Sequence, residues 1–339
     1  MDLDPSYIMM VGTSYGPSKT LLSAVELGVF TRLGDGSATG EEIGAALGLH
    51  PRAVWDFLDA LVALRFLDRD GNGKDARYRN TPETAMFLDK NSPQYIGGIL
   101  EMCNARLFRF WADLTEALRT ARPQNEIKYA GKTMFEELYA NPDQLEQFMH
   151  AMESLSLPTF EAFARRFDFS SCQTLCDVGG ATGRLCIIAA RQHPHLRNVT
   201  FDLPPVEPIA RKTVEAAGLG DRVEVVSGDF FATPLPRADV ITMSLILHDW
   251  GLDKKMHLIR SAYEALPPGG TLVAIENMID DARRKSVFGL ISSLNMLIES
   301  GDGFDFTGAD FSSWCSEAGF KKVEILPLTG QASAGVAVK

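Results

Sequence analysis

The sequence has few cysteines and no excess of basic residues, and each shortage excludes a class of protein. Its five cysteines form no C-x-x-C pair and have no histidine at a zinc-binding spacing, so we expect buried free thiols in a reducing compartment. Lysine and arginine number 33 against 44 aspartates and glutamates, which gives a net charge of −11. No basic run offsets this charge, and an acidic chain repels a phosphate backbone. We therefore expect no nucleic-acid partner.

Long apolar runs are also missing. No stretch approaches the roughly 20 apolar residues that cross a bilayer, and the opening MDLDPSYIMMVG lacks the charged-then-apolar order of a signal peptide. These features predict a cytoplasmic protein that does not contact a membrane. At 339 residues, 45% of them hydrophobic and 23% charged, the chain is long enough for two domains with a sizeable core.

The first part of the chain has the apolar spacing of short helices. Thr39 and Glu42 have the spacing of a capping box at one helix start. Residues 66–81 then have the pattern of two short strands around a Gly-Asn-Gly turn. Helix, turn, helix and hairpin is the order of a winged helix. This order predicts a first domain over 1–95, followed by a helical connector over 96–168 that is rich in methionine and aromatic residues.

From about residue 170 the pattern changes to a regular alternation of strand and helix. This alternation predicts an α/β domain over 169–339, with a mostly parallel sheet covered by helices on both faces. Strands are expected over 174–178, 198–202, 222–227, 238–244, 270–276, 322–327 and 333–338. Helices are expected over 183–193, 205–217, 253–266, 285–299 and 308–318.

The segment LCDVGGATGRLCIIAAR, residues 175–191, joins the first of these strands to a helix through a glycine-rich turn. Such a turn usually holds a nucleotide-like ligand. A dinucleotide fingerprint requires G-x-G-x-x-G, but Ala181 stands where its second glycine belongs. Gly179 and Gly183 still fit a tight turn with a close backbone approach. The loop therefore argues against a pyrophosphate ligand and against a dehydrogenase.

Two aspartates follow the next strands at positions that suit an adenosine. Asp202 ends the second strand, 19 residues after Gly183, where it is expected to face a ribose diol. Asp229 follows the third strand and is placed to accept from an exocyclic amine, with Phe230 alongside a purine ring. This order assigns no group to a phosphate, so it favours S-adenosylmethionine over NAD. Each aspartate taken alone is also explained as a solvated loop or cap residue.

The segment SLILHDWGLDKK, residues 244–255, places His248 at the carboxyl end of a strand, where α/β active sites form. Glu276 ends the next strand, 28 residues further on, and we expect it to lie close by. A carboxylate there would hold one imidazole nitrogen and leave the other free as a base. A structural histidine and a salt bridge at the end of the strand are the alternatives.

Six segments occur in this order: DVGGATG, FDLP, GDFF, LHDW, EALPPGG and AIEN. Together they resemble the small-molecule O-methyltransferases of the plant caffeate/flavonoid and bacterial antibiotic-tailoring type. The resemblance covers the whole chain, because that family has an N-terminal winged-helix dimerisation domain. It implies a Rossmann-like class I methyltransferase sheet and a homodimer formed through the N-terminal domain. It also implies methyl transfer from S-adenosylmethionine, leaving S-adenosylhomocysteine, to a phenolic or enolic hydroxyl of a small aromatic secondary metabolite. The implied reaction requires no metal.

The same resemblance implies residue roles. His248 would be the general base, Glu276 its partner, and Asp305 the third catalytic position, where plant members have a glutamate and where Asp302 and Asp310 are rivals. The residues implied to bind S-adenosylmethionine are Ser156, Asp177, Gly179, Gly180, Gly183, Asp202, Leu203, Asp229, Phe230, Ser244 and Trp250. Ser244 stands where many plant members have a lysine. The residues implied to line the substrate pocket are Phe148 and Met152, in the connector, and Met296, in the α/β domain. Core packing explains these three equally well.

Two other functions remain open. A methyltransferase acting on carbon or nitrogen would use the same scaffold, and a non-catalytic winged-helix regulator would use S-adenosylmethionine as a signal. The would-be recognition helix over 51–66 carries Arg52 but also Asp56 and Asp59, and its remaining face is apolar. Base-reading helices present outward Arg, Lys, Asn or Gln. The helix is therefore better suited to packing against a partner chain.

Overall fold

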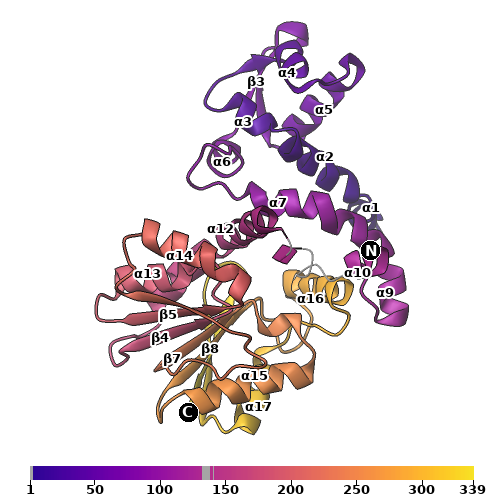
Figure 1. Ribbon diagram of the computed structural model, residues 1–339. Helices are drawn as coiled ribbons and strands as arrows, with labels where there is room; N and C mark the ends of the chain where they lie inside the picture. Colours follow the sequence, from indigo (N-terminus) through magenta and orange to yellow (C-terminus); the bar gives the residue numbers. More distant parts are fainter. Residues whose placement is uncertain (1–2, 132–137, 140) are drawn as a thin grey trace. The chain divides into compact units, whose positions relative to one another are not determined.

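The computed structural model describes residues 3–131, 138–139 and 141–339, and the chain divides into two units (Figure 1). The first unit comprises residues 1–109 and the second residues 110–339. The division falls inside the segment predicted as a helical connector. Each unit has its own buried core.

The first unit consists of short helices and a small sheet. Its α-helices are α1 (Ser6–Gly12), α2 (Tyr15–Glu26), α3 (Val29–Leu33), α4 (Gly40–Leu47), α5 (Pro51–Ala63), α6 (Pro82–Phe87) and α7 (Gly97–Met102). A turn of π-helix, η2 (Cys103–Leu107), follows α7, and α8 (Phe108–Phe110) spans the division between the units. The sheet has the order β1 (Ala38–Thr39), β3 (Arg77–Asn80), β2 (Leu67–Asp70), and the short helix η1 (Gly73–Asp75) lies in the β2–β3 turn.

Local signals in the sequence set the boundaries of these elements. The Thr39 hydroxyl accepts from the backbone N–H of Glu42, and the Glu42 carboxylate accepts from that of Thr39, so the predicted capping box begins α4. Pro51 opens α5, and the predicted hairpin is present as β2 and β3. The spaced apolar residues of the helices close over one core, whose centre includes Phe30, Ile43, Leu58, Leu61 and Tyr78.

The second unit begins with helices that precede its sheet. They are η3 (Trp111–Asp113), α9 (Leu114–Thr120), α10 (Glu126–Ala130) and the long α12 (Pro142–Arg166). The sheet follows with seven strands in the described residues: β4 (Thr174–Val178), β5 (Arg197–Asp202), β6 (Val223–Ser227), β7 (Val240–Ser244), β8 (Thr271–Glu276), β9 (Lys322–Pro327) and β10 (Ser333–Val338). Every strand that the sequence predicts is present.

The strand order is β6-β5-β4-β7-β8-β10-β9, and β10 runs antiparallel to both of its neighbours. The first five strands in this order are parallel, as the alternation predicts, so their carboxyl ends meet at one edge. Because β4 and β7 lie at the centre, the loops that follow them open at the middle of that edge. This edge carries most of the predicted site residues.

Helices cover both faces of this sheet (Figure 1). They are α13 (Arg184–Gln192), α14 (Glu207–Ala216), α15 (Leu252–Ala265) and α17 (Gly308–Ala318), with α16 (Val287–Glu299) and the short η4 (Pro204–Val206) and η5 (Leu247–Asp249) in the connections. Successive strand residues point to opposite faces. Leu175 therefore packs with residues of α12 and α13, whereas Cys176 packs with residues of α15 and α17. The two largest apolar clusters of this unit therefore lie on opposite faces of the sheet.

The cysteine prediction is correct for three of the five residues. Cys176, Cys186 and Cys315 are buried free thiols, and burial raises the pKa of each. Cys103 and Cys172 are also free but only partly buried, because they lie in a helix and a loop beside the packed cores rather than within them. In the part of the chain that the structure describes, every helix is too short or too polar to cross a membrane.

Candidate active site

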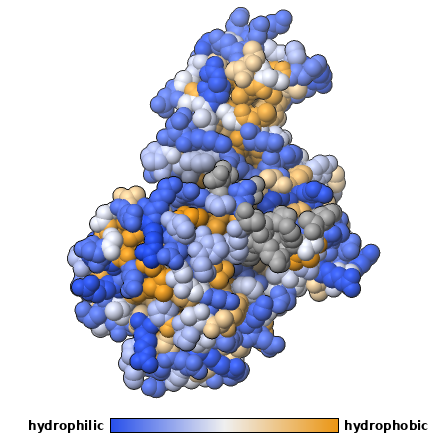
Figure 2. Space-filling view, viewed as in Figure 1, coloured by the Kyte–Doolittle hydropathy of each residue, from blue (hydrophilic) through white to orange (hydrophobic). Residues whose placement is uncertain are grey.

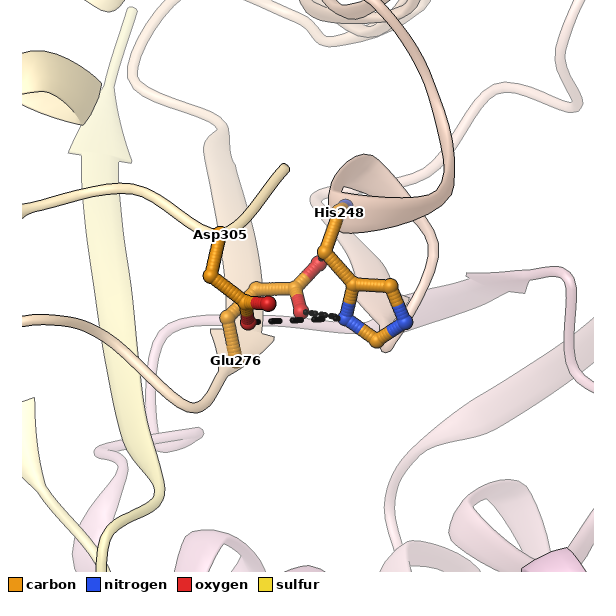
Figure 3. Close-up of side chains that lie close together, drawn as sticks. All are labelled: His248, Glu276 and Asp305. Carbon is orange, nitrogen blue, oxygen red and sulfur yellow. Dashed lines mark hydrogen bonds and ion pairs between the residues drawn. The ribbon is translucent and has the colours of Figure 1, made fainter. Parts of the chain in front are cut away.

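His248 and Glu276 meet at the carboxyl ends of the adjacent parallel strands β7 and β8. The imidazole Nδ1 lies 2.8 Å from Glu276 Oε2 (Figure 3). Because an ionised carboxylate only accepts hydrogen bonds, Nδ1 is the donor. Glu276 Oε1 accepts from the backbone N–H of Leu247 at 2.9 Å, which fixes the carboxylate. Glu276 is 1% exposed and His248 is 8% exposed. This arrangement leaves the second ring nitrogen, Nε2, on the side away from Glu276.

Asp305 lies on the same side of the imidazole as Glu276 and also approaches Nδ1 (Figure 3). Its Oδ1 is 3.9 Å from His248 Nδ1, and neither carboxylate oxygen has a hydrogen-bond partner within the described residues. Burial raises the pKa of Asp305 to about 6. Of the two rivals, Asp302 is exposed and Asp310 accepts from the Thr307 backbone N–H in the capping box of α17. One ligand atom each of His248, Glu276 and Asp305 lies within 4.8 Å of the others.

Asp249 is a neighbour of the base that the sequence analysis did not assign. Its Oδ1 lies 3.2 Å from His248 Nε2, the nitrogen that Glu276 leaves free. Burial alone lowers the pKa of His248, but the carboxylates of Glu276 and Asp249 outweigh it and hold that pKa well above the usual imidazole value. The imidazole is therefore a stronger base than a free histidine. The position of Asp249 directly after His248 in LHDW was the one available signal.

The glycine-rich turn after β4 needs small residues and left-handed backbone. Gly179 and Gly183 have φ angles of 71° and 76°. A Cβ atom on Gly180 would lie 2.2 Å from Thr200 Oγ1 and 3.0 Å from the Asp177 carbonyl oxygen. Ala181 also has a positive φ, 47°, which a residue with a Cβ adopts only at a cost. The two glycines suit this turn, and Ala181 is the one of these three residues held in a conformation that it does not favour.

Asp202 ties this turn to the end of β5. Its Oδ2 accepts from the Ala181 N–H at 2.8 Å, and its Oδ1 accepts from the Leu203 N–H at 2.7 Å. Asp177 lies below the turn and accepts from the Thr242 hydroxyl at 2.7 Å. Burial raises the pKa of both aspartates, that of Asp177 to about 7. Each carboxylate oxygen can accept further hydrogen bonds, so carboxylates at this edge of the sheet suit the hydroxyl groups of a ribose as donors.

The predicted adenine contacts lie around an aromatic cluster. Asp229 is exposed, and its Oδ1 accepts from the Phe231 N–H at 2.8 Å, so it also stabilises a turn. The Phe231 and Trp250 rings meet edge to face at 4.9 Å, and Phe230 lies 6.3 Å from Trp250. Trp250 Nε1 is buried without a partner in the described part of the chain. A buried donor without a partner fits a site that an additional polar group completes.

A cavity of about 260 Å³ adjoins Glu276. Ser156 of α12 and Ser244 at the end of β7, 88 residues apart in the sequence, both line it, together with Phe288 of α16. The structure therefore brings two predicted binding residues to one cavity. Three residues were predicted to line the substrate pocket: Phe148, Met152 and Met296. None of them is among the described residues that line this cavity. Phe148 instead packs against the cluster of Leu145, Met149, Val206 and Ile209.

Tyr139 is a second neighbour of the site that the sequence analysis missed. Burial raises its pKa, and the carboxylates of Asp202 and Asp249 raise it further, which places the phenol near both. A single tyrosine in a helical stretch carries no sequence signal of this position. Lys255 is a third such residue, and it is fully buried.

Comparisons with known proteins show the family of this chain. The model of the O-methyltransferase domain matches residues 111–321, and the model of the O-methyltransferase dimerisation domain matches residues 12–90. The first match includes His248, Glu276 and Asp305, and the second covers most of the first unit.

Individual relatives span nearly the whole chain. The tetracenomycin polyketide synthesis 8-O-methyl transferase of Streptomyces glaucescens is 39% identical, over 96% of this chain and 94% of its own length. The N,N-dimethyltransferase OxyT of Streptomyces rimosus is 36% identical, over 93% and 90%. The structure of human N-acetylserotonin methyltransferase in complex with S-adenosylmethionine has a TM-score of 0.91 and 28% identity, over 100% of this chain and 99% of that one. The chain belongs to the O-methyltransferase family and is an S-adenosylmethionine-dependent enzyme.

Proposed function

We propose that this enzyme methylates a hydroxyl group of a small aromatic metabolite, with His248 as the general base. The observation that carries the proposal is the 2.8 Å contact between His248 Nδ1 and Glu276 Oε2, with Oε1 anchored by the Leu247 N–H. In the neutral imidazole this contact keeps the proton on Nδ1 and the lone pair on Nε2, where the acceptor hydroxyl takes the place of the 3.2 Å contact with Asp249 Oδ1. A base must reach the proton that it abstracts, and Nε2 faces away from the carboxylate that orients the ring.

The proposed step is a direct displacement. S-adenosylmethionine supplies a methyl group that is made electrophilic by its sulfonium. His248 Nε2 accepts the proton of the acceptor hydroxyl as the oxygen attacks that methyl group, the C–S bond breaks, and the sulfur keeps the bonding electron pair. Glu276 stabilises the imidazolium that forms. Asp249, 3.2 Å from Nε2, adds a second negative charge beside it.

The raised pKa of His248 lowers the cost of the proton transfer. A phenol with a pKa near 10 and an ordinary histidine near 6.5 differ by about 5 kcal/mol. The charges of Glu276 and Asp249 narrow this gap. General-base catalysis then contributes a factor of roughly 10² to 10⁴, and the fixed geometry of donor and acceptor contributes much of the rest.

We propose that the cofactor binds across the edge formed by β4, β5 and the loop after β6. The glycine turn at 179–183 allows close backbone approach, and the Asp202 carboxylate suits the ribose hydroxyls. Asp229, Phe230 and Trp250 border the adenine end, where the Trp250 indole N–H is available as a donor. Tyr139 and Ala181 of the glycine turn pack against the same apolar cluster, so Tyr139 borders this site.

The cavity beside Glu276 is lined by the predicted cofactor residues Ser156 and Ser244 and not by His248, and its chemistry suits part of the cofactor or an edge of a flat, mostly apolar acceptor. Phe288 and Ile275 provide apolar walls, and Ser156, Ser244 and Asn277 provide a few polar groups. Binding sites of this composition orient aromatic ligands through a small number of hydrogen bonds. The similarity to an 8-O-methyl transferase of polyketide synthesis supports a phenolic acceptor.

Nitrogen methylation is the second candidate, because a relative 36% identical to this chain is an N,N-dimethyltransferase. A primary or secondary amine would use the same base and the same donor site. Fragmentation and NMR of the methylated product distinguish the two, since an O-methyl and an N-methyl group differ in chemical shift and in acid stability.

A methyl-transfer assay with labelled S-adenosylmethionine tests the proposal. The acceptors are naphthols and hydroxylated anthraquinones, each with an amine analogue of the same ring. We expect transfer to the hydroxylated series, and a His248→Ala loss of 10² to 10⁴ in kcat with S-adenosylhomocysteine affinity unchanged. A chelator is expected to leave the rate unchanged. Full activity of folded His248→Ala contradicts the assignment of the base.

We also propose a homodimer formed through the first unit. The match to a dimerisation domain supports it, and so do the side chains of α1, of which Tyr7 and Ile8 are 72% and 73% exposed. Figure 2 shows further apolar side chains gathered on the visible face of this unit, between polar margins. Exposed apolar patches on this scale commonly mark an interface.

A further inference from the structure

Lys255 is a buried lysine close to His248, and both its burial and its position in a helix disfavour a positive charge. It lies in the first turn of α15 and is 0% exposed. Burial opposes its charge, and the positive end of the α15 dipole opposes it again. These two effects disfavour a lysine here unless nearby groups offset them.

Carboxylates of the active site and its border offset these effects in part. Burial lowers the pKa of Lys255 to about 8, whereas Glu276 of β8, Asp305 and Asp302 of the loop after α16, and Asp249 of η5 all raise it. Glu276 and Asp305 flank His248 Nδ1, and Asp249 flanks Nε2. The lysine is therefore the counter-charge of the cluster that surrounds the base.

The ammonium group also joins two loops. It donates to the carbonyl oxygens of Trp250 and Phe304, the second at 2.8 Å, and lies 3.5 Å from the centre of the Phe304 ring. Trp250 follows His248 by two residues, and Phe304 directly precedes Asp305. The two carbonyls therefore belong to the loop that carries the base and to the loop that carries the second carboxylate.

The same two loops touch at one further point. A Cβ atom on Gly303 would lie 2.6 Å from the Asp249 carbonyl oxygen, so the backbones are in close contact there. A bare backbone contact of this kind limits how closely the two loops approach, but it contributes little attraction between them. Lys255 provides the attraction across this contact.

We propose that Lys255 is a positioning residue for methyl transfer: it ties the His248 loop to the Asp305 loop and neutralises part of the negative charge around the imidazole. The inference rests on the proposed role of His248 as the base. Lys255 does not touch the reacting atoms, so its removal is expected to affect the reaction through the position and the basicity of His248.

Lys339 offers a matched control, because it makes the same kind of contact away from the site. Its Nζ donates to the carbonyls of Tyr263 and Leu266, at 2.6 and 2.7 Å, and lies 4.4 Å from the centre of the Tyr263 ring. It follows β10 beside the start of β8, at the opposite edge of the sheet from His248. Loss of Lys339 removes two carbonyl contacts and a cation–π contact without changing the charge around the base.

The experiment compares Lys255→Met with Lys339→Met in the full-length enzyme. Three quantities are measured: kcat and KM, the dissociation constant of S-adenosylhomocysteine, and the pKa of His248 by NMR of labelled imidazoles, with the resonance assigned by its loss in His248→Ala. We expect Lys255→Met to lower kcat at least about 10-fold and to raise the His248 pKa by about 0.5 or more, because a nearby cation no longer opposes protonation. KM and S-adenosylhomocysteine binding are expected to change less than about threefold. Lys339→Met is expected to leave all of these quantities unchanged.

Two results overturn the inference: an unchanged kcat and His248 pKa in Lys255→Met, or equal losses in the two lysine variants. If the methionine variant does not fold, Lys255→Gln replaces it, since glutamine keeps a donor but has no charge, and the same rise in the His248 pKa is expected. If His248→Ala retains activity, the proposed function fails instead. The titration of His248 then still decides whether Lys255 controls the cluster.

Discussion

His248 and Glu276 make a buried contact in which one carboxylate serves two purposes: Oε2 accepts from the imidazole Nδ1 at 2.8 Å, and Oε1 accepts from the Leu247 N–H at 2.9 Å. The carboxylate thus orients both the ring and the turn that carries it. Without this contact no hydrogen bond from β8 would hold the orientation of the imidazole in η5. This double use explains why a fully buried glutamate ends β8.

Replacement of Glu276 by Gln tests this double use. The amide nitrogen or oxygen of glutamine satisfies only part of the contact, so the preferred tautomer of His248 is lost. We expect kcat to fall by about 10² or more, with S-adenosylhomocysteine affinity within about threefold, measured by calorimetry. Asp310→Asn, in the capping box of α17, is the control and is expected to lower stability without this loss of kcat. A Glu276→Gln enzyme with full kcat contradicts the orienting role.

The pH profile of kcat/KM is expected to report the raised pKa of His248. The base acts in its neutral form, so kcat/KM rises as pH increases through that pKa, which lies well above 6.5. Glu276→Gln and Asp249→Asn each remove a charge that raises this pKa, so the rising limb moves to lower pH in both variants. Stability changes with the opposite sign: the contribution of charged His248 is complete below its unfolded pKa and is lost as pH rises through the folded one. If the rising part of the kcat/KM profile has the same midpoint pH in both variants as in the wild type, His248 is not the titrating group.

Asp202→Ala is expected to abolish tight binding of the cofactor product. In the proposed cofactor site the variant would lose hydrogen bonds to the ribose hydroxyls, each worth about 1.5–3 kcal/mol when one partner is charged, and it also frees the Ala181 N–H that now binds Oδ2. Affinity for S-adenosylhomocysteine should therefore fall at least about 100-fold. The control is Asp168→Ala, an exposed aspartate that accepts from the Ser170 N–H. Equal affinity of the two variants would place the ribose elsewhere.

Two substitutions in the glycine turn are expected to change the stability of the protein in different directions. Ala181→Gly relieves a left-handed alanine that costs about 1–2 kcal/mol, against about 0.5–1 kcal/mol of glycine backbone entropy, so stability stays equal or rises. Gly180→Ala introduces a Cβ atom 2.2 Å from Thr200 Oγ1 and is expected to lose about 1–3 kcal/mol. Gly220→Ala, with nothing within 4 Å of its Cβ position, is the neutral control. Thermal unfolding measures all three variants, and destabilisation by Ala181→Gly would show that its φ is not strained.

Charge on helix α1 is expected to weaken the dimer. Ile8 and Met9 are 73% and 59% exposed, and an interface that covers them would bury an aspartate at either position. The Ile8→Asp, Met9→Asp variant should raise the dimer dissociation constant at least about 10-fold, measured by light scattering over a dilution series. Leu118→Asp, equally exposed in the second unit, is the control and is expected to leave the dimer intact. A monomeric wild-type protein contradicts the proposed dimer.

The sequence by itself determined the elements and the main pair of the site. The alternation of strands and helices was sufficient for the seven strands, because buried parallel strands read as short apolar runs between turn signals. Parallel order also places the ends of neighbouring strands together, and this is why His248 and Glu276 were predicted to meet although 28 residues separate them. The capping box at Thr39 is likewise a local signal with a local cause.

Only the tertiary structure decided how loops and long side chains meet. Asp302, Asp305 and Asp310 lie in one loop and helix start, and nothing periodic distinguishes them, yet the structure buries Asp305 beside the base, exposes Asp302 and assigns Asp310 to a helix cap. Ser156 and Ser244 meet in a cavity because α12 packs with residues of β4, β7 and β8, a contact that no local pattern encodes.

Lys255 is the clearest case. It follows another lysine in a charged helix start, a pattern typical of a solvated face. Whether its ammonium reaches water or two backbone carbonyls depends on the loop 49 residues further on. Local propensity decides whether a residue is helical, but burial and the partners of a long side chain depend on which segments fold against it.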